Sequence, residues 1–338
     1  GIAVNAHYAL ARVSLPPPNA APGAPVPTIP ATLPDPRSLF LGYQYNLAKL
    51  PDQPMRPRVA DPRVGYFLTS RFDYSSDTKL TPNVNYVKRW RLEKKDPTAA
   101  LSEPKQPIVF WIDRNVPVRY RDTIVAGVLE WNKAFERIGF KDAVQAKIQP
   151  DDADVETLDA RHASIRWMTS ARPIFGGIGP SQADPRTGEI LDADIAIDPV
   201  RLRFARYRLA DSSGATASGS GTGGTNAFAQ TLLPENATVC RIADFLAEER
   251  GFALDLLSAR GVIDPDGPAA EEFVLSDLKE VTMHEVGHAL GLTHNFRAST
   301  IYTQAQLNDK AFTRKHGVSG SVMEYTPINL ALRNEPQG

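Results

Sequence analysis

The segment "MHEVGHALGLTHNF", residues 283–296, constrains the fold more than any other part of this sequence. It holds three of the chain's six histidines, at positions 284, 288 and 294. On a helix, His284 and His288 lie one turn apart on the same face, with Cβ atoms about 5–6 Å apart. Two imidazoles at that spacing can both reach one metal ion at about 2.0–2.1 Å. The segment therefore predicts a helix that carries a metal site.

The residues around these histidines include start and stop signals for a helix. No proline interrupts "SDLKEVTMHEVGHALGL", and Ser276 is a suitable N-cap with Asp277 in the first turn. Gly291 tolerates positive φ and can end the helix sharply. We expect the chain to turn there, so that His294 approaches the same ion from outside the helix.

The three histidines and Glu285 together indicate catalysis. Three neutral nitrogens leave one position of a tetrahedral ion open, as in catalytic zinc sites, whereas structural sites have four protein ligands. Zinc lowers the pKa of a bound water to about 7, and Glu285 can accept its proton and pass it to a leaving amine. H-E-x-x-H alone also occurs by chance or on non-catalytic helices. The fixed offsets of Gly291 and His294 favour the catalytic interpretation.

The full pattern, H-E-x-x-H-x-x-G-x-x-H, resembles the signature of the metzincin proteases. That resemblance predicts a methionine turn downstream, and "GSVMEYTP" supplies Met323. In metzincins this methionine lies beneath the metal and is not a ligand. Tyr325 is similar to the tyrosine of astacins and serralysins, which alternates between ligating the metal and stabilising the oxyanion. The alternative for Tyr325 is a packed aromatic ring whose hydroxyl has a partner elsewhere.

Other segments are similar to a family of large bacterial zinc-dependent metalloproteases with flanking domains of unknown function. They lie between Leu50 and Asn329 and include "DPRVGYF", "RWRLEKKDP", "PIVFWIDRNVP", "GVLEWNKAFERIGF", "ADPRTGEIL" and "SVMEYTPIN". This resemblance implies one catalytic Zn²⁺ and a bacterial enzyme that is secreted, periplasmic or on the cell surface. Such proteases continue beyond the methionine turn, so we expect a truncated C-terminal subdomain here.

Analogy with the metzincins also assigns a role to "FGGIGPSQADPRTGEIL". Gly177, Ile178 and Gly179 would form the edge strand above the cleft. An edge strand has unpaired backbone N–H and C=O groups, so an extended peptide can add to it. The alternative is an ordinary glycine-rich turn followed by a hairpin.

Periodicity along the chain predicts an α+β or α/β domain. The resemblance to the metzincins implies the α+β class, with residues 106–338 as a metzincin-like catalytic domain that has a twisted mixed sheet, a backing helix and the active-site helix. Apolar runs at 107–113, 143–149, 163–169 and 192–198 indicate strands, and residues 121–140 have helical spacing that ends at Gly139. An insertion is expected at about 201–270. It includes the glycine- and serine-rich residues 211–225 and one or two helices in 241–261.

Residues 1–105 are expected to form an extended strap that is partly β, with proline-rich residues 14–37. Strands are expected within 67–76 and 83–95. The strap has no core of its own before Arg63 and must lie on the catalytic domain. It is either a brace remote from the metal or a latency segment that places Asp52 or Asp61 on it.

Composition excludes several classes of protein. The formal net charge is −1 with 23% charged residues, so no nucleic-acid partner is expected. The mean hydropathy is −0.29. No apolar run approaches the roughly 20 residues of a membrane span. The only cysteine, Cys240, excludes an internal disulfide and a cysteine-rich zinc site. Nothing in the sequence indicates an oligomeric state.

These observations predict a zinc-dependent endopeptidase that acts on a peptide or protein substrate. One alternative is a catalytically impaired pseudoprotease or peptide-binding module, in which the metal site survives beside an incomplete cleft. Another is a zinc hydrolase of a non-peptide amide. The presence of Glu285 favours an enzyme over a binding module.

Overall fold

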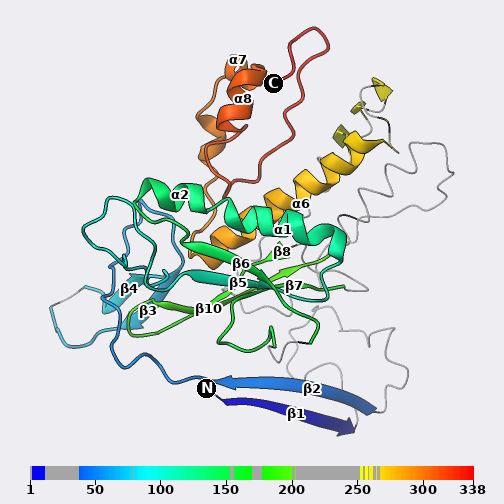
Figure 1. Cartoon of the computed structure of the whole chain (residues 1–338). Coiled ribbons are helices and arrows are strands. Elements are labelled where there is room, and N and C mark those ends of the chain that lie inside the picture. The colour runs from blue at the N-terminus through cyan, green and yellow to red at the C-terminus, as the bar shows by residue number, and fades with distance from the viewer. Residues whose placement is uncertain are drawn as a thin grey trace, which may run out of the picture.

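The computed structural model describes residues 2–11, 38–78, 80–152, 156–169, 177–199, 202, 252–253, 256–257, 259–261, 264 and 267–338. The proline-rich residues 14–37, the glycine- and serine-rich residues 211–225, Cys240 and most of the helices expected in 241–261 lie outside this set. The described part has the predicted α+β fold: helices cover one face of a mixed sheet (Figure 1).

A six-stranded sheet forms the centre of the molecule. Its order is β6-β5-β7-β10-β8, and β9 also pairs with β10. The apolar runs predicted as strands form its four parallel members, β5 Ile108–Ile112, β6 Val144–Ile148, β7 Ser164–Trp167 and β10 Ile190–Ile197. The two short strands β8 Gly177–Ile178 and β9 Ser181–Ala183 run antiparallel to β10. Within the described residues, β8 is therefore the edge strand on this side of the sheet.

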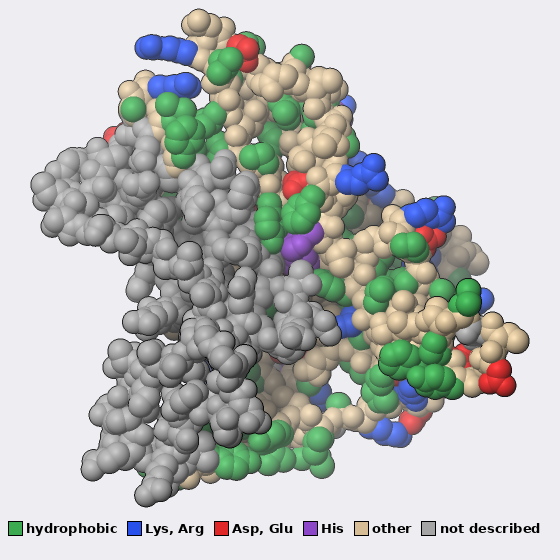
Figure 2. Space-filling model, turned by 180° about the vertical axis from the view of Figure 1, so that it is seen from behind, with side chains coloured by type: hydrophobic (Ala, Val, Ile, Leu, Met, Phe, Trp, Pro, Cys, Tyr) green, Lys and Arg blue, Asp and Glu red, His purple; other side chains and the backbone are tan. Residues whose placement is uncertain are grey.

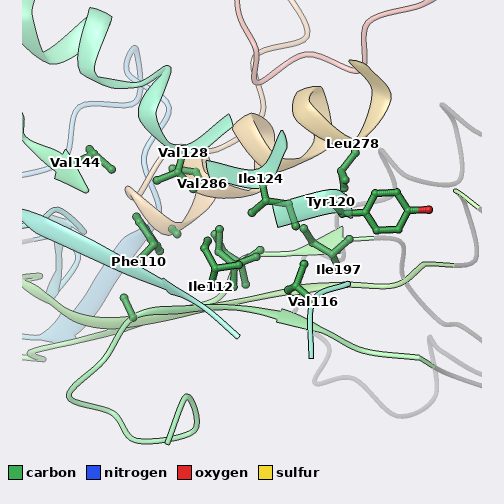
Figure 3. Packing of buried hydrophobic residues seen from close by; sticks show 14 of the residues in the cluster. Phe110, Ile112, Val116, Tyr120, Ile124, Val128, Val144, Ile197, Leu278 and Val286 are labelled. Carbon is green, nitrogen blue, oxygen red and sulfur yellow. The ribbon is translucent and has the colours of Figure 1, made fainter. Parts of the chain in front are cut away.

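Two helices, α1 Val118–Leu129 and α6 Pro268–Ala289, lie on the same face of the sheet (Figure 1). The main core fills the space beneath them. Figure 3 shows Phe110 and Ile112 of β5 next to Ile124 and Val128 of α1, with Val286 of α6 nearby. All five of these side chains are fully buried. This packing fixes α6, and so its histidines, relative to the sheet.

Two helix boundaries differ from the prediction. The helix expected over 121–140 begins at Val118 and breaks after Leu129, and α2 continues as Asn132–Arg137. At the break, the indole N–H of Trp131 donates to the carbonyl of Met283 on α6, at 2.9 Å. Gly139 does end the second helix, with φ of 88°.

The active-site helix also begins earlier than expected, so Ser276 is not its N-cap. Gly267 is the N-cap, and Pro268 occupies the first turn. Proline there has the φ that a helix requires and has no N–H to leave unpaired. The good helix formers of "PAAEEFVL" then extend the helix upstream by two turns.

The N-terminal region contributes two antiparallel strand pairs. The strands predicted within 67–76 and 83–95 are β3 Leu68–Phe72 and β4 Asn83–Val87, which pair with each other. The first pair, β1 Ile2–Ala11 with β2 Ser38–Leu47, was not predicted, although alternation in "IAVNAHYALA" is a strand signal. This hairpin lies on the side of the sheet opposite the helices (Figure 1). The side-chain amide of Asn46 ties it to the carbonyl of Leu158, at 2.8 Å.

After α6 the chain forms short helices and returns to the metal site. These are the 3-10 helix η1 Ala298–Thr300, then α7 Gln304–Leu307 and α8 Lys310–His316. Among the helices of the described ranges, none combines the length and apolar character that crossing a bilayer requires.

Replacing Ile124 with alanine tests the core beneath α1. Its side chain is fully buried. We expect the free energy of unfolding to fall by roughly 2–5 kcal/mol, from lost transfer energy and the cavity left behind. Urea unfolding measures this change. Ile138, at the end of α2, is 66% exposed. Ile138→Ala is the matched control and should cost less than about 0.5 kcal/mol. Equal losses in both variants would contradict this description of the core.

Candidate metal centre

The last turns of α6 bring the predicted residues together. His284, Glu285 and His288 lie on this helix and are buried. The helix ends at Ala289, and Gly291 follows with φ of 103°. A Cβ at Gly291 would lie 2.3 Å from the carbonyl oxygen of Lys88, so only glycine fits this turn. The turn brings His294 back toward the two helical histidines.

The three imidazoles direct one nitrogen each to a common point. The Nε2 atoms of His284 and His288 are 3.1 Å apart, and those of His288 and His294 are 3.2 Å apart. Two nitrogen ligands of a tetrahedral zinc ion are separated by about 3.3 Å. Among the described residues, these three form the one group of His, Cys, Asp and Glu side chains able to hold a metal ion.

The hydrogen bonds of the other ring nitrogens set the tautomers of the helical pair. Nδ1 of His284 lies 2.7 Å from the carbonyl oxygen of Val322, and Nδ1 of His288 lies 2.8 Å from that of Leu292. A carbonyl can only accept, so each Nδ1 is the donor and each Nε2 has a lone pair. Two lone pairs at this separation repel each other. A cation between them removes that repulsion, so the donor set fits a metal ion.

Burial keeps the three histidines in the neutral form that a metal requires. It lowers the pKa of His284 to about 3 and that of His294 to about 4, and in both cases the neighbouring His288 adds to the effect. Burial also lowers the pKa of His288 below its ordinary value. The rings therefore do not have to lose a proton before they bind an ion at neutral pH.

Glu285 lies directly against the edge of the sheet. Its side chain is fully buried. A Cβ at Gly177 would lie 2.6 Å from its Oε1, and a Cβ at Gly179 would lie 2.5 Å from its backbone oxygen. The absence of side chains at these two glycines lets β8 cross α6 in contact with Glu285. The structure thus places the predicted edge-strand residues beside the predicted general base.

Met323 packs against α6 at Gly287. It is buried, and a Cβ at Gly287 would meet its sulfur at 2.2 Å. Gly287 immediately precedes His288, so the methionine packs on the turn of α6 that carries both helical histidines. The backbone N–H of Asn295 donates to the carbonyl of Met323 at 2.9 Å and ties this turn to the His294 segment. The role of Gly287 was not predicted from the sequence, because its need for space comes from Met323, which is distant along the chain.

Aromatic rings surround the third histidine. The rings of Tyr325 and Phe296 lie 4.7 and 5.1 Å from that of His294, measured between centroids. Phe296 is 54% exposed, and its position beside the ligands was not predicted. Seen from behind, histidine atoms are visible at the surface next to hydrophobic side chains (Figure 2). One side of the metal centre is therefore apolar.

The two aspartates considered as latency residues are paired elsewhere. The carboxylate of Asp52 lies 2.6 Å from Lys49, and that of Asp61 lies 2.6 Å from Arg63. Neither belongs to the group that can hold a metal ion. The structure does not bring them to the histidines.

Comparison with known families agrees with this geometry. A family model described as Met-zincin matches residues 266–338, and a model of a domain of unknown function matches residues 28–95. Residues 266–338 are thus similar to the Met-zincin family, and we call them the Met-zincin region. No curated protein and no solved structure matches the chain significantly.

The Met-zincin region contains the histidines, Glu285, Met323 and Tyr325, but residues outside it hold its helix in place. The indole N–H of Trp90 donates to the carbonyl of Ala289 at 2.9 Å, near the last turn of α6. Trp131 makes the corresponding bond one and a half turns earlier, as described above. These two tryptophans were not predicted, because nothing in the local sequence signals such long-range bonds.

Replacing His288 with alanine tests the metal centre. We expect the parent protein to retain about one zinc ion per chain after dialysis and the variant to retain far less, because two nitrogens hold an ion much more weakly than three. Elemental analysis of purified protein measures this. His316→Ala, at an exposed ring at the end of α8, is the control and should keep the parent's metal content. Unchanged metal in the His288 variant would show that the ion binds elsewhere.

Proposed function

We propose that the protein is a zinc-dependent endopeptidase whose active site comprises His284, His288, His294 and Glu285. The observation that carries the proposal is the convergence of three neutral imidazole nitrogens beside a buried glutamate. The match of residues 266–338 to the Met-zincin family supports the same reading. Three protein ligands leave a coordination position for a reactant, which a closed structural site does not.

Glu285 would act first as a general base and then as a general acid. Zinc, when bound, supplies the Lewis acidity that makes water a nucleophile at neutral pH. The Glu285 carboxylate would accept a proton from the water that attacks the peptide carbonyl. The protonated carboxyl then donates to the leaving amine, which restores the carboxylate for the next cycle. Glu285 follows His284 on α6 and does not belong to the group of three histidines that would hold the ion, so its carboxylate would serve proton transfer and not ligation.

The sheet edge gives the substrate a direction and a binding mode. An extended peptide could add to the outer side of β8, where its backbone would exchange hydrogen bonds with Gly177 and Gly179. Because β8 contacts Glu285, a peptide bond bound there would lie close to the general base. Main-chain hydrogen bonds do not depend on the side chains of the peptide. Binding at this edge would therefore suit an endopeptidase that recognises the extended backbone of its substrate. The contact between β8 and Glu285 also favours an enzyme over a module that only binds peptides.

Tyr325 is the proposed donor to the oxyanion. Its ring packs on two rings of the proposed ligand set, with centroid distances of 4.7 Å to His294 and 5.7 Å to His284. A phenol hydroxyl in that region could stabilise the negative charge that develops on the carbonyl oxygen. If Tyr325 is only a packed aromatic ring, removal of its hydroxyl should change stability and not kcat, which the Tyr325→Phe variant tests.

Glu285→Gln separates proton transfer from metal binding. The amide has nearly the same size but cannot accept a proton, so we expect cleavage of a denatured protein such as casein to fall at least about 100-fold. Zinc content should be unchanged. Glu272→Gln, at an exposed position on the same helix, should retain full activity. Near-parental turnover by the Glu285 variant would exclude Glu285 as the base.

Tyr325→Phe should lower kcat by about one to three orders of magnitude, with a smaller effect on KM, if the hydroxyl serves the transition state. Steady-state kinetics on a fluorogenic peptide and thermal unfolding are measured on the same preparations. Tyr302→Phe is the control, because its hydroxyl donates to the carbonyl of His316 at 3.3 Å, away from the histidines. A loss of stability without a loss of kcat would assign Tyr325 to packing.

A further inference from the structure

A short N-terminal segment pairs with the chain that follows the active-site helix. Tyr66 and Leu292 form an antiparallel bridge. The N–H of Phe67 donates to the carbonyl of Gly291 at 2.8 Å, and the N–H of Thr293 donates to that of Gly65 at 3.2 Å. The Phe67 ring also packs on the His288 ring, with centroids 5.5 Å apart. Residues 65–67 thus form an antiparallel β-bridge with the segment between the second and third histidines.

This pairing acts on groups that set the geometry of the histidines. Leu292, the partner of Tyr66, is also the residue whose carbonyl accepts the Nδ1–H of His288. A displacement of Leu292 would release that ring to rotate, or would change its tautomer. Thr293, held by Gly65, immediately precedes His294. Residues 65–67 therefore constrain the ring orientation of His288 and the backbone position of His294.

The N-terminal region is also bonded to the turn before β10 of the central sheet, which holds residues 65–67 in place relative to the sheet. The guanidinium of Arg91 makes paired bonds of 2.8 and 2.6 Å to the buried carboxylate of Glu189, and it also donates to the carbonyl of Gln53. The guanidinium of Arg186 donates to the carbonyl of Pro51 at 2.8 Å. These bonds join both flanks of residues 65–67 to the turn that leads into β10. Paired Arg–carboxylate bonds are geometrically restrictive, which suits a rigid anchor.

We propose that residues Gly65–Phe67, within the matched domain of unknown function, are a positioning element of the metal centre that fixes His288 and His294 for metal binding. The inference rests on the proposed metal centre and assigns this N-terminal region a role in it. It differs from both roles considered from the sequence: the segment is neither a brace remote from the metal nor an inhibitor that ligates it.

Gly65 offers a sharp test, because it touches the His294 segment without contacting a ligand ring. A Cβ there would lie 2.7 Å from Oγ1 of Thr293, closer than such atoms approach, and 3.8 Å from the carbonyl oxygen of His294. Gly65→Ala should therefore push Thr293 away. Thr293→Ala removes the colliding oxygen, so the double variant Gly65→Ala/Thr293→Ala should restore the pairing. Gly42→Ala is the control, because a Cβ there meets only His7 at 3.5 Å, an ordinary contact.

The readout is metal binding, measured on the full chain without reference to peptide cleavage. Zinc affinity is obtained by competition with a chromophoric chelator. The visible absorption of the cobalt(II)-substituted protein reports the geometry of the three nitrogens. We expect Gly65→Ala to weaken zinc binding by about 10-fold or more, in the range found when the partner of a metal-ligating histidine is lost, and to alter the cobalt spectrum. The double variant should bind zinc within about 3-fold of the affinity of the Thr293→Ala single variant, and its cobalt spectrum should match that of the single variant. Gly42→Ala should match the parent in both measurements.

Phe67→Leu gives a second, independent measurement, because it keeps an apolar side chain but removes the ring that packs on His288. It should also weaken zinc binding and change the cobalt spectrum. Zinc affinities and cobalt spectra equal to the parent's in both Gly65→Ala and Phe67→Leu would overturn the inference and leave the proposed endopeptidase intact. If the two variants have lower melting temperatures in the metal-free form but bind metal like the parent, the inference is also overturned. A parent protein that binds no zinc would instead overturn the metal centre itself.

Discussion

Three imidazole nitrogens that converge in a buried space are the constraint on which the rest of this structure depends. The Nε2 atoms of His284 and His288 lie 3.1 Å apart with their lone pairs directed at each other, because each Nδ1 donates to a carbonyl. That arrangement is unfavourable until a cation is present. The protein must therefore hold the rings in place through contacts elsewhere, and the packing around α6 supplies them.

Several segments of the chain pack closely against the C-terminal part of α6, each at a glycine. Gly287 leaves room for the sulfur of Met323, and Gly291 leaves room for the carbonyl of Lys88. On the side of the sheet edge, Gly177 has no Cβ that would collide with Glu285. Each glycine lets a different segment touch the helix within one turn of a functional side chain. A close-packed surround of this kind restricts rotamers and so preorganises the site before any ligand binds.

The N-terminal region completes that surround. Two backbone hydrogen bonds and the packing of the Phe67 ring on His288 link the matched domain of unknown function to the Met-zincin region. Asp52 and Asp61 are paired with nearby cations and take no part. Backbone pairing of this kind can hold the metal-binding segment in place without requiring particular side chains at the paired positions. The candidate metal centre is thus assembled from two regions that are separate in sequence.

The sequence by itself determined the local features: the helical His284 and His288 pair, the stop at Gly291, and the strands of the sheet. Each depends on residues within a few positions of one another, where spacing translates directly into geometry. Only the tertiary structure decided where α6 begins, why residue 287 is glycine, and that residues 65–67 reach the metal site. Those features depend on contacts between segments far apart in the chain, and a periodic pattern carries no record of which distant backbone will lie against it.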